Sequence, residues 1–358
     1  MDGVADIDAV RRPDGARSRL GTTFCMEYGE VVVKQCSSRR MVCLSQRILP
    51  RLLPVAGLTL AVSLPGWAAT GPSVGADPLP LDTTAPPSAA SADGAPSSDT
   101  PWFNQDLTLI GSKDISFGPR PSDDIYLEYE YYGRKGPYEL YGYIDAPKVL
   151  GIGNSHDSGE WDKGSPVFME HEPRISIDEL TGHTLAFGPF KEFYLAFDWI
   201  YDMGHTKADR ANTLYSGFGT DIKTGTPVIL SANLYARRQW ENYGAANENS
   251  WDGYRAQLKY ILPLKHFDNG ASLTYIGFTN HDFGSDLHDQ AGPSRTANAT
   301  VATNVILYNY KHVRLMTAGR YFHNGGQWKD GTELNFGDGN FNARSTGWGY
   351  YFGIGYQF

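Results

Sequence analysis

The 358-residue sequence predicts an all-β fold, a transmembrane antiparallel β-barrel of about 12 strands that follows a signal peptide and a disordered linker. Three observations support this prediction. Residues 347–358 alternate large apolar or aromatic side chains with a second set that is mostly glycine. Similar alternating stretches recur from Trp102 onwards, between breaks rich in Gly, Asn and Asp. All three cysteines precede residue 50, and a closed barrel needs no disulfide framework.

The C-terminal stretch is the clearest predicted strand. Successive side chains on a strand point to opposite faces. One face carries only large apolar or aromatic residues, namely Trp348, Tyr350, Phe352, Ile354, Tyr356 and Phe358. The length matches the roughly 9–11 residues of a membrane strand, and aromatic residues lie at both ends, as at lipid–water interfaces. A soluble, half-buried strand could alternate in the same way. A C-terminal phenylalanine on such a strand is a common ending of bacterial outer-membrane barrels. We therefore expect the protein to lie in the bacterial outer membrane.

Composition excludes several classes of function. The net charge of −9 and the pI near 5.5 give no indication of nucleic-acid binding. The sequence contains no HExxH motif, no paired-cysteine metal motif and no G-x-S-x-G elbow. We therefore predict no catalytic site, no metal and no cofactor, although a barrel enzyme whose residues meet only on folding is not excluded.

The N-terminal third contains no predicted barrel strand. Residues 1–40 are charged and irregular, and Met41 begins the pattern of a secretory signal peptide. Its apolar core, residues 52–64, is too short for a permanent membrane helix, and cleavage is expected after Ala68. We interpret 1–40 as an over-called upstream extension, and a genuine N-terminal extension is the alternative. The signal peptide then covers residues 41–68.

Residues 69–101 are rich in Ala, Pro, Ser, Asp and Thr, a composition that predicts a flexible linker because it buries little apolar surface. The barrel is predicted over residues 102–358. At roughly 10 residues per strand plus turns and loops, this length accommodates about 12 strands. The expected long outer loops are residues 151–165, 281–296 and 324–345.

The predicted barrel strands have one apolar face and one face with both ionisable and aromatic residues, which is the pattern of a membrane barrel. The candidates that share the inward face are Tyr126, Glu128, Glu130, Tyr141, Tyr143, Glu170, Arg174, Tyr194, Asp198, Arg255 and Lys259. A soluble β-sandwich is the alternative, since its inner face is also apolar. It would place these charges in bulk water, where tyrosines between carboxylates have no special role.

The inward residues suggest solute binding. Tyrosine rings offer faces on which a heterocyclic base stacks for roughly 1–3 kcal/mol, and the neighbouring ionisable groups can bind a ribose or a base edge through hydrogen bonds. Several weak sites along a narrow lumen would let a solute move from one to the next. The alternative is that the inward charges only pair across the lumen, and composition alone favours this alternative.

Several longer runs are more specific. They are SFGP at 116–119, DIYLEYE at 124–130, YGYIDAP at 141–147, SPVFMEHEPRISIDELT at 165–181, FGPFKEFY at 187–194, QWENYGAANENSWDGYR at 239–255, YIGFTN at 275–280 and HNGGQWKDGTELNFGDGNFNARSTGWG at 323–349. These runs resemble the Tsx family of nucleoside-specific channels of the bacterial outer membrane, and the resemblance covers residues 102–358.

The resemblance implies a 12-stranded barrel whose narrow lumen passively conducts nucleosides and deoxynucleosides. It also implies outer-membrane lipid as surroundings and outer loops that can dock phages or colicins. A Phe-Gly motif that affects substrate passage in the family matches Phe117 and Gly118 here, which are therefore candidate substrate-binding residues. Ser116 replaces a basic residue of the family, and this departure bears on selectivity. Departures in residues 286–296 and in the linker bear more on phage and colicin docking than on transport.

Three alternatives to a nucleoside channel remain: a general small-solute porin, a surface receptor or adhesin anchored by the barrel, and a barrel enzyme.

Overall fold

The computed structural model describes residues 22–27, 30–35, 101–153, 167–337 and 339–358. The chain forms two compact units, Met1–Pro65 and Gly66–Phe358. The predicted signal peptide lies outside the described residues, and so does the predicted linker apart from Pro101.

The described residues of the first unit form a hairpin, in which β1 (Thr22–Glu27) pairs antiparallel with β2 (Glu30–Gln35). The interpretation of residues 1–40 as an over-called extension stays a prediction, and these two segments are strands that the sequence analysis did not identify. Residues 31–33 are all valine, and β-branched side chains favour strands.

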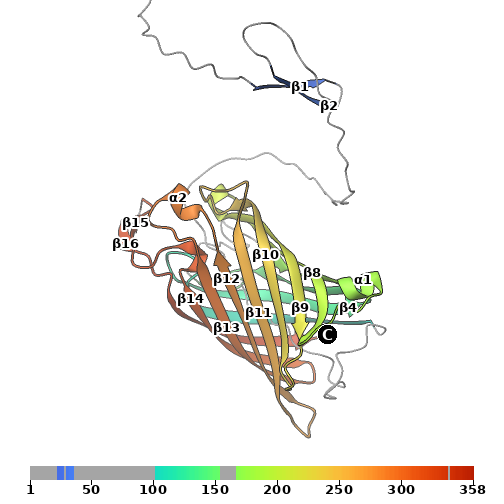
Figure 1. The fold of residues 1–358 in the computed structure, drawn as a ribbon. Helices are drawn as coiled ribbons and strands as arrows, with labels where there is room; N and C mark the ends of the chain where they lie inside the picture. The colour runs from blue at the N-terminus through green and yellow to red at the C-terminus, as the bar shows by residue number, and fades with distance from the viewer. Residues whose placement is uncertain (1–21, 28–29, 36–100, 154–166, 338) are drawn as a thin grey trace, which may run out of the picture. The chain divides into compact units, whose positions relative to one another are not determined.

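The second unit is built from long strands joined by turns and loops (Figure 1). Its strands are β3 (Trp102–Ile115), β4 (Ser122–Lys135), β5 (Tyr138–Ala146), β6 (Phe168–His171), β7 (Arg174–Ser176), β8 (Phe190–Met203), β9 (Arg210–Ile222), β10 (Ile229–Asn242), β11 (Ser250–His266), β12 (Ser272–Phe283), β13 (Ala299–Tyr310), β14 (Val313–His323) and β17 (Gly347–Gln357).

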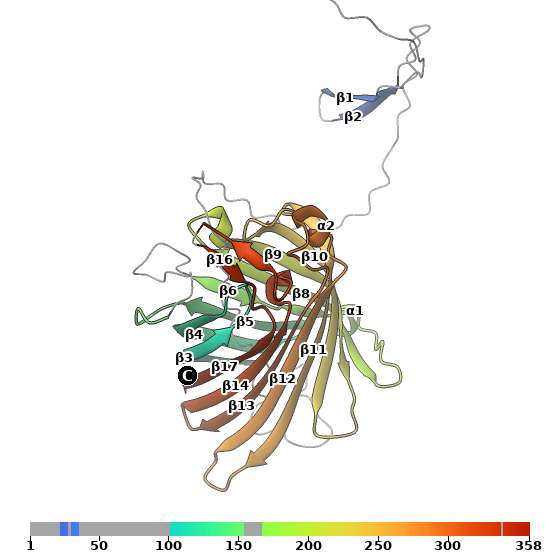
Figure 2. The ribbon, with the colours of Figure 1, turned by 90° about the vertical axis from the view of Figure 1, so that its left-hand side faces the viewer.

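These strands close into a barrel, which Figure 2 shows from a second side. Neighbours along the chain pair antiparallel, and β17 pairs with β3, so the first and last barrel strands meet. The sheet has 13 strand segments, but β6 and β7 both lie between β5 and β8 and together make one interrupted strand. Pro173 lies in the interruption, where it has no N–H to donate to the ladder. The barrel therefore has 12 strands, which confirms the predicted fold.

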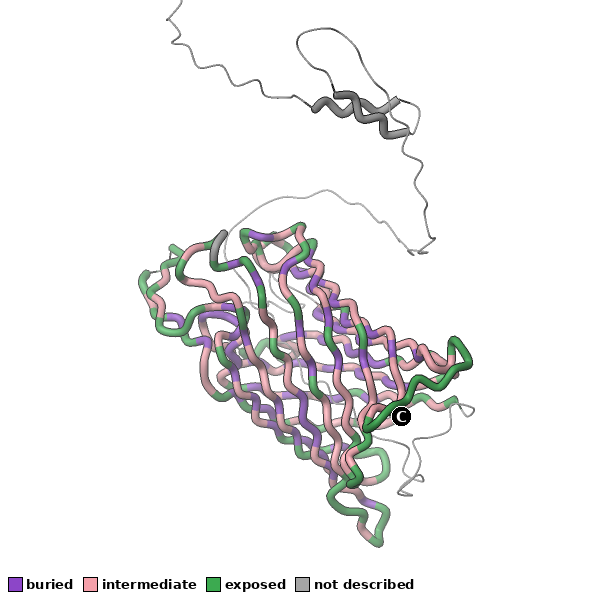
Figure 3. Tube along the Cα trace, viewed as in Figure 1, coloured by how far each residue is buried: buried purple, intermediate pink, exposed green. Residues whose placement is uncertain are grey.

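The predicted faces of the strands are also confirmed. Exposed and buried residues alternate along the barrel strands (Figure 3). In β17, Phe352 is 64% exposed whereas its neighbour Tyr351 is 0% exposed. Gly353, between the outward residues, makes room for a neighbouring inward side chain, because a Cβ there would lie 2.6 Å from the Met316 side chain.

Replacing Phe352 with arginine is expected to destabilise the barrel by roughly 2–4 kcal/mol, because it places a charge in the hydrocarbon region. Gly353→Ser, on the inward face of the same strand, is the matched control. Its cost should be smaller, since it introduces no charge and requires only that the Met316 and Thr108 side chains shift. Urea unfolding in lipid vesicles measures both changes, and the reverse order of the two costs would contradict the assignment of faces.

The connections differ at the two ends of the barrel. One end, which we call the loop end, carries the β12–β13 and β14–β17 connections, where two of the long loops were expected. The third expected loop, 151–165, lies outside the described residues apart from 151–153. The β12–β13 connection contains α2 (Leu287–Ala291), and the β14–β17 connection contains η3 (Gly325–Gln327) and a small hairpin of β15 (Glu333–Asn335) and β16 (Asn340–Asn342). The predicted loop 281–296 begins too early, because residues 281–283 still belong to β12.

The opposite end, the short-turn end, carries the C-terminus and mostly short turns, such as the one between β13 and β14. Longer extracellular loops and shorter periplasmic turns are typical of outer-membrane barrels. In an outer-membrane barrel, the short-turn end would be the periplasmic one. Among the described residues, no helix is long and apolar enough to cross a membrane.

Candidate solute-binding site in the lumen

All predicted inward strand residues have side chains that are buried or nearly so. Nine of them belong to the buried set: Tyr126, Glu128, Glu130, Tyr141, Tyr143, Glu170, Tyr194, Asp198 and Arg255. The side chains of Arg174 and Lys259 are 12% and 16% exposed. The structure divides this set into groups at different depths.

The first group lies near the short-turn end and is fully paired. Arg174 donates from Nε to Glu139 Oε1 (2.7 Å) and from Nη1 to Asp221 Oδ1 (3.0 Å). Its guanidinium carbon lies 4.0 Å from the centroid of the Tyr194 ring. The Tyr194 hydroxyl donates to Asp221 Oδ2 (2.9 Å). One face of Tyr194 is thus covered by Arg174.

The side chains of a second group are also paired with one another. Lys259 donates from Nζ to Glu172 Oε2 (2.7 Å) and lies 4.8 Å from the centroid of the Tyr141 ring. The Tyr143 hydroxyl donates to Glu170. In these two groups the inward charges pair with one another, most of them on neighbouring strands and Lys259 with Glu172 across the lumen, as the alternative interpretation of the sequence expects.

A third group joins three strands through one arginine. Arg314 on β14 donates from Nη1 to Asp106 Oδ2 (2.6 Å) and to Glu130 Oε2 (3.0 Å). All three side chains are fully buried. Glu130 therefore acts as part of an ion-pair network rather than as a free hydrogen-bonding group.

Glu128 and Tyr126 differ from these groups. Glu128 is 0% exposed, yet neither of its carboxylate oxygens has a hydrogen-bond partner among the described residues. The buried hydroxyl of Tyr126 also has none within the described chain. Asp145 lies opposite Glu128 in the β4–β5 register. Glu128 and Tyr126 therefore keep unused hydrogen-bonding groups on the inward wall, within the described part of the chain.

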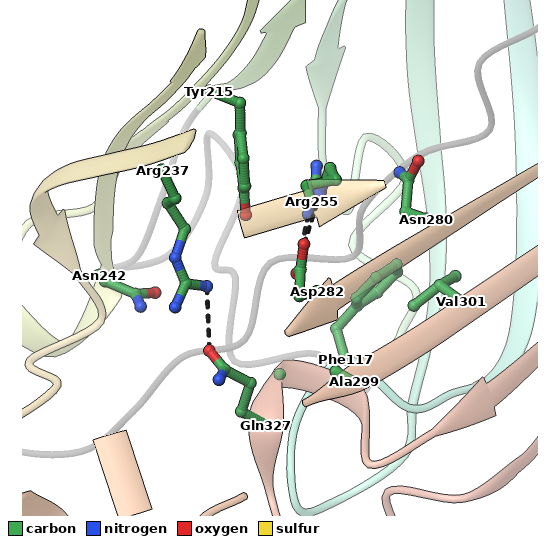
Figure 4. Close-up of a pocket in the computed structure, with 11 residues that line it drawn as sticks. Phe117, Tyr215, Arg237, Asn242, Arg255, Asn280, Asp282, Ala299, Val301 and Gln327 are labelled. Atoms are coloured by element: carbon green, nitrogen blue, oxygen red, sulfur yellow. Dashed lines mark hydrogen bonds and ion pairs between the residues drawn. The ribbon is translucent and has the colours of Figure 1, made fainter. Parts of the chain in front are cut away.

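A cavity of about 110 Å³ lies nearer the loop end (Figure 4). Its lining residues are Phe117, Tyr215, Arg237, Asn242, Arg255, Asn280, Asp282, Ala299, Val301, Gly326 and Gln327. Phe117 comes from the β3–β4 connection and packs edge-on against Phe322, with 4.9 Å between the ring centroids. The cavity therefore combines two aromatic rings, the half-buried Phe117 and the buried Tyr215, with amide and charged groups.

Ion pairs fix the polar side of the cavity. Arg255 donates to Asp198 Oδ2 (2.8 Å) and, through Nε and Nη2, to both carboxylate oxygens of Asp282 (2.8 and 3.1 Å). The Arg255 guanidinium also lies 3.8 Å from the centroid of the Tyr215 ring. Asn280 Oδ1 is buried and has no hydrogen-bond partner in the described part of the chain. Asn280 can therefore accept a hydrogen bond from a solute that enters the cavity.

The outer side of the cavity is closed by η3, which the β14–β17 connection folds inward. Gln327 accepts a hydrogen bond from Arg237 Nη1 (2.9 Å) and donates to the Thr296 carbonyl (3.1 Å). Gly325 and Gly326 permit this position in the β3–β4 connection's immediate neighbourhood. A Cβ on Gly325 would lie 1.7 Å from the Ser116 carbonyl oxygen, and a Cβ on Gly326 would lie 2.1 Å from the Phe117 carbonyl oxygen. Only residues without a side chain allow the two connections to approach so closely.

The predicted candidates and the cavity overlap in Phe117 and Arg255. Gly118 is buried next to Phe117 but does not line the cavity. Alternation alone marks the inward position of Arg237, whereas no pattern in the sequence identifies Gln327 as a lumen residue, because it lies in a loop. The binding roles of all the candidates stay predictions. Within the described ranges, no group of three or more His, Cys, Asp or Glu residues could hold a metal ion.

Comparison with known proteins identifies the family. The family model described as "Nucleoside-specific channel-forming protein, Tsx" matches residues 98–358. The Tsx protein of Salmonella typhimurium is 53% identical over 257 residues, which cover 72% of this chain and 88% of the relative. The Tsx protein of Klebsiella pneumoniae is 51% identical over 278 residues, covering 75% and 94%.

A more distant relative is the outer membrane protein OmpK of Vibrio parahaemolyticus. It is 31% identical over 263 residues, which cover 73% of this chain and 88% of the relative. The match to the family model includes every strand of the barrel. The chain therefore belongs to the Tsx family of nucleoside-specific channel-forming proteins, as its sequence motifs predicted.

Proposed function

We infer that this protein is a passive channel for nucleosides, including deoxynucleosides, in the bacterial outer membrane. The observation that carries this inference is the match of the channel family over the whole barrel. Its role is transport rather than catalysis, and its location is the outer membrane. A closed barrel with a polar lumen is also the structure that such a channel requires.

The cavity beneath η3 is the proposed outer binding site for the nucleoside. Phe117 supplies an aromatic face for the base, and such stacking contributes roughly 1–3 kcal/mol. Asn280 and Asp282 supply acceptors for ribose hydroxyls or for the amino group of a base. Glu128 and Tyr126 supply a second set of hydrogen-bonding groups, so a nucleoside would pass between at least two weak sites, as conduction requires.

Replacing Phe117 with alanine is expected to lower the flux of nucleosides at low concentration and to leave the flux of small sugars unchanged. A weak site helps a channel most when the solute is scarce, so the defect should shrink as the nucleoside concentration rises. Flux of labelled adenosine and of a labelled pentose into proteoliposomes measures both effects.

The matched control is Phe352→Ala, which removes an equal ring from the lipid-facing side of the barrel. It should not change the ratio of the two fluxes. Equal losses for adenosine and pentose in Phe117→Ala would mean that Phe117 shapes the pore without recognising the base. The general porin would then be the better description.

The processing of the N-terminus is a further part of the proposal. The mature chain should begin near Ala69, after removal of a signal peptide at 41–68, and residues 70–100 should be sensitive to protease. Terminal sequencing of protein isolated from outer membranes tests this expectation. A mature protein that retains residues 1–40 would contradict it.

Lipid and surface partners complete the proposed function. The outward apolar residues of the barrel would contact the hydrocarbon of the outer membrane. The outer loops expose aromatic residues such as Phe336. The guanidinium carbon of Arg295 lies 3.9 Å from the centroid of the Trp328 ring, and that of Arg120 lies 3.8 Å from the centroid of the Phe341 ring. These loops would dock a phage or colicin. Deleting the β15–β16 hairpin should abolish such docking and leave nucleoside flux intact.

A further inference from the structure

An apolar surface projects from the short-turn end of the barrel, outside the lumen. It is formed by α1 (Ile177–Thr181) and by the connection from α1 to β8, at the side of the barrel in Figure 1. Leu180, Leu185 and Phe187 are 59%, 44% and 63% exposed. We call the surface made by these three residues, Phe190 and Phe193 the apolar foot.

The rings of the apolar foot pack on one another rather than on the barrel interior. Phe187 stacks on Phe193, with 5.7 Å between the centroids and 12° between the planes. Phe190 lies 5.1 Å from Phe187 and 6.0 Å from Phe193. No residue of α1 is buried. A folded chain rarely leaves several apolar side chains together in water, and such patches usually mark an interaction site.

The backbone of the apolar foot is firmly held. Asp178 accepts hydrogen bonds from the Phe193 N–H (2.9 Å) and from the Leu185 N–H (2.6 Å). Phe187 and Phe190 exchange backbone hydrogen bonds of 3.1 and 3.0 Å. The polar groups of the segment are thus satisfied from within, and the apolar side chains are held in place on the outside.

The apolar foot is continuous with the lipid-facing surface. Phe193 belongs to the outward face of β8, on which Leu195 and Phe197 follow in alternation. Two exposed basic residues flank it. Lys191 follows Phe190 in the chain, and the Lys223 N–H donates to the Pro189 carbonyl (2.7 Å). Apolar rings beside lysines suit a phospholipid with an anionic headgroup, because acyl chains pack on the rings and phosphate pairs with lysine.

We propose that the apolar foot binds phospholipid of the periplasmic leaflet, with a preference for an anionic headgroup at Lys191 and Lys223. The contact lies beside the barrel wall and is separate from the conducting lumen. It extends the lipid contact of the protein beyond the barrel strands.

Photo-crosslinking of the intact protein tests this proposal. Phe187 is replaced by p-benzoylphenylalanine, and the protein is folded into vesicles of phosphatidylethanolamine and phosphatidylglycerol. The matched control carries the same residue at Asp268, an exposed polar position in another turn of the short-turn end. After irradiation, mass spectrometry should find phospholipid adducts at position 187 and a severalfold lower yield at position 268. Heat-dependent gel migration verifies that both proteins are folded.

The composition of the adducts tests the headgroup preference. Phosphatidylglycerol should be enriched in the adducts relative to the vesicle, and the double variant Lys191→Gln, Lys223→Gln should remove this enrichment. Equal adducts at positions 187 and 268 would overturn the proposal, and so would a protein–protein adduct, which would assign the surface to a second copy. Nucleoside flux is measured on the same proteoliposomes, so a failure of the lipid contact is distinguishable from a failure of the channel.

Discussion

Replacing Arg314 with methionine is expected to destabilise the barrel by about 3–5 kcal/mol, the usual cost of removing one partner of a buried ion pair. Arg314 is the shared partner of Asp106 and Glu130, and all three side chains are fully buried. Without the guanidinium, two carboxylates face each other in the lumen wall with no positive charge between them. Each must then become protonated or draw water into a packed region.

Urea unfolding in lipid vesicles, followed by tryptophan fluorescence, measures this cost. Arg344→Met is the matched control, because Arg344 is exposed and, among the described residues, its contact is a backbone hydrogen bond to Pro119. Its effect should stay within about 0.5 kcal/mol, as for most surface substitutions. Adding Asp106→Asn and Glu130→Gln to Arg314→Met should recover much of the lost stability, since the uncompensated charges are then gone. A triple variant as unstable as Arg314→Met alone would show that the arginine stabilises by packing instead.

Replacing Gln327 with alanine is expected to widen the outer entrance and to weaken the discrimination between nucleosides and sugars. The side chain links η3 to Arg237 on one side and to the Thr296 carbonyl on the other. Alanine removes both hydrogen bonds, while Arg237 keeps its ion pair with Asp252. The loop end then loses a contact that holds η3 over the cavity. Single-channel conductance should rise, and disaccharide flux should rise more than adenosine flux.

Asn335→Ala is the matched control for this change. Asn335 lies in β15 of the same connection, is exposed, and within the described ranges its side chain pairs with Asn340 and with the Gly337 N–H of the same hairpin. Its conductance should equal that of the unchanged protein. If Gln327→Ala and Asn335→Ala gave the same conductance and the same ratio of fluxes, η3 would not limit passage, and the restriction would lie deeper, among the paired charges of the lumen.

The face of each barrel strand follows from the sequence alone. Alternation along β17 assigns Phe352 to lipid and Tyr351 to the lumen, because successive side chains on a strand must point in opposite directions. The number of strands follows from the length of the alternating region, and the family follows from long local motifs. These properties depend on residues that are close in the chain, so they can be predicted without knowing what the strands contact.

The partners of the inward residues were decided only by the tertiary structure. Alternation places Glu128 and Glu130 on the same face, but it does not show that Glu130 pairs with Arg314 while Glu128 lacks a hydrogen-bond partner in the described residues. Such pairs join strands far apart in the chain, and they depend on the depth and register of each strand around the closed barrel.

The outer part of the candidate site depends even more on the closed fold. Phe117 was identified from a family motif, but its neighbours Gly326 and Gln327 come from a loop without alternation. They reach the lumen because Gly325 and Gly326 allow η3 to contact the backbone of the β3–β4 connection. The chain therefore determines locally which faces meet lipid and lumen. Barrel closure and loop packing determine which lumen residues stand together, because those contacts exist only after distant strands have met.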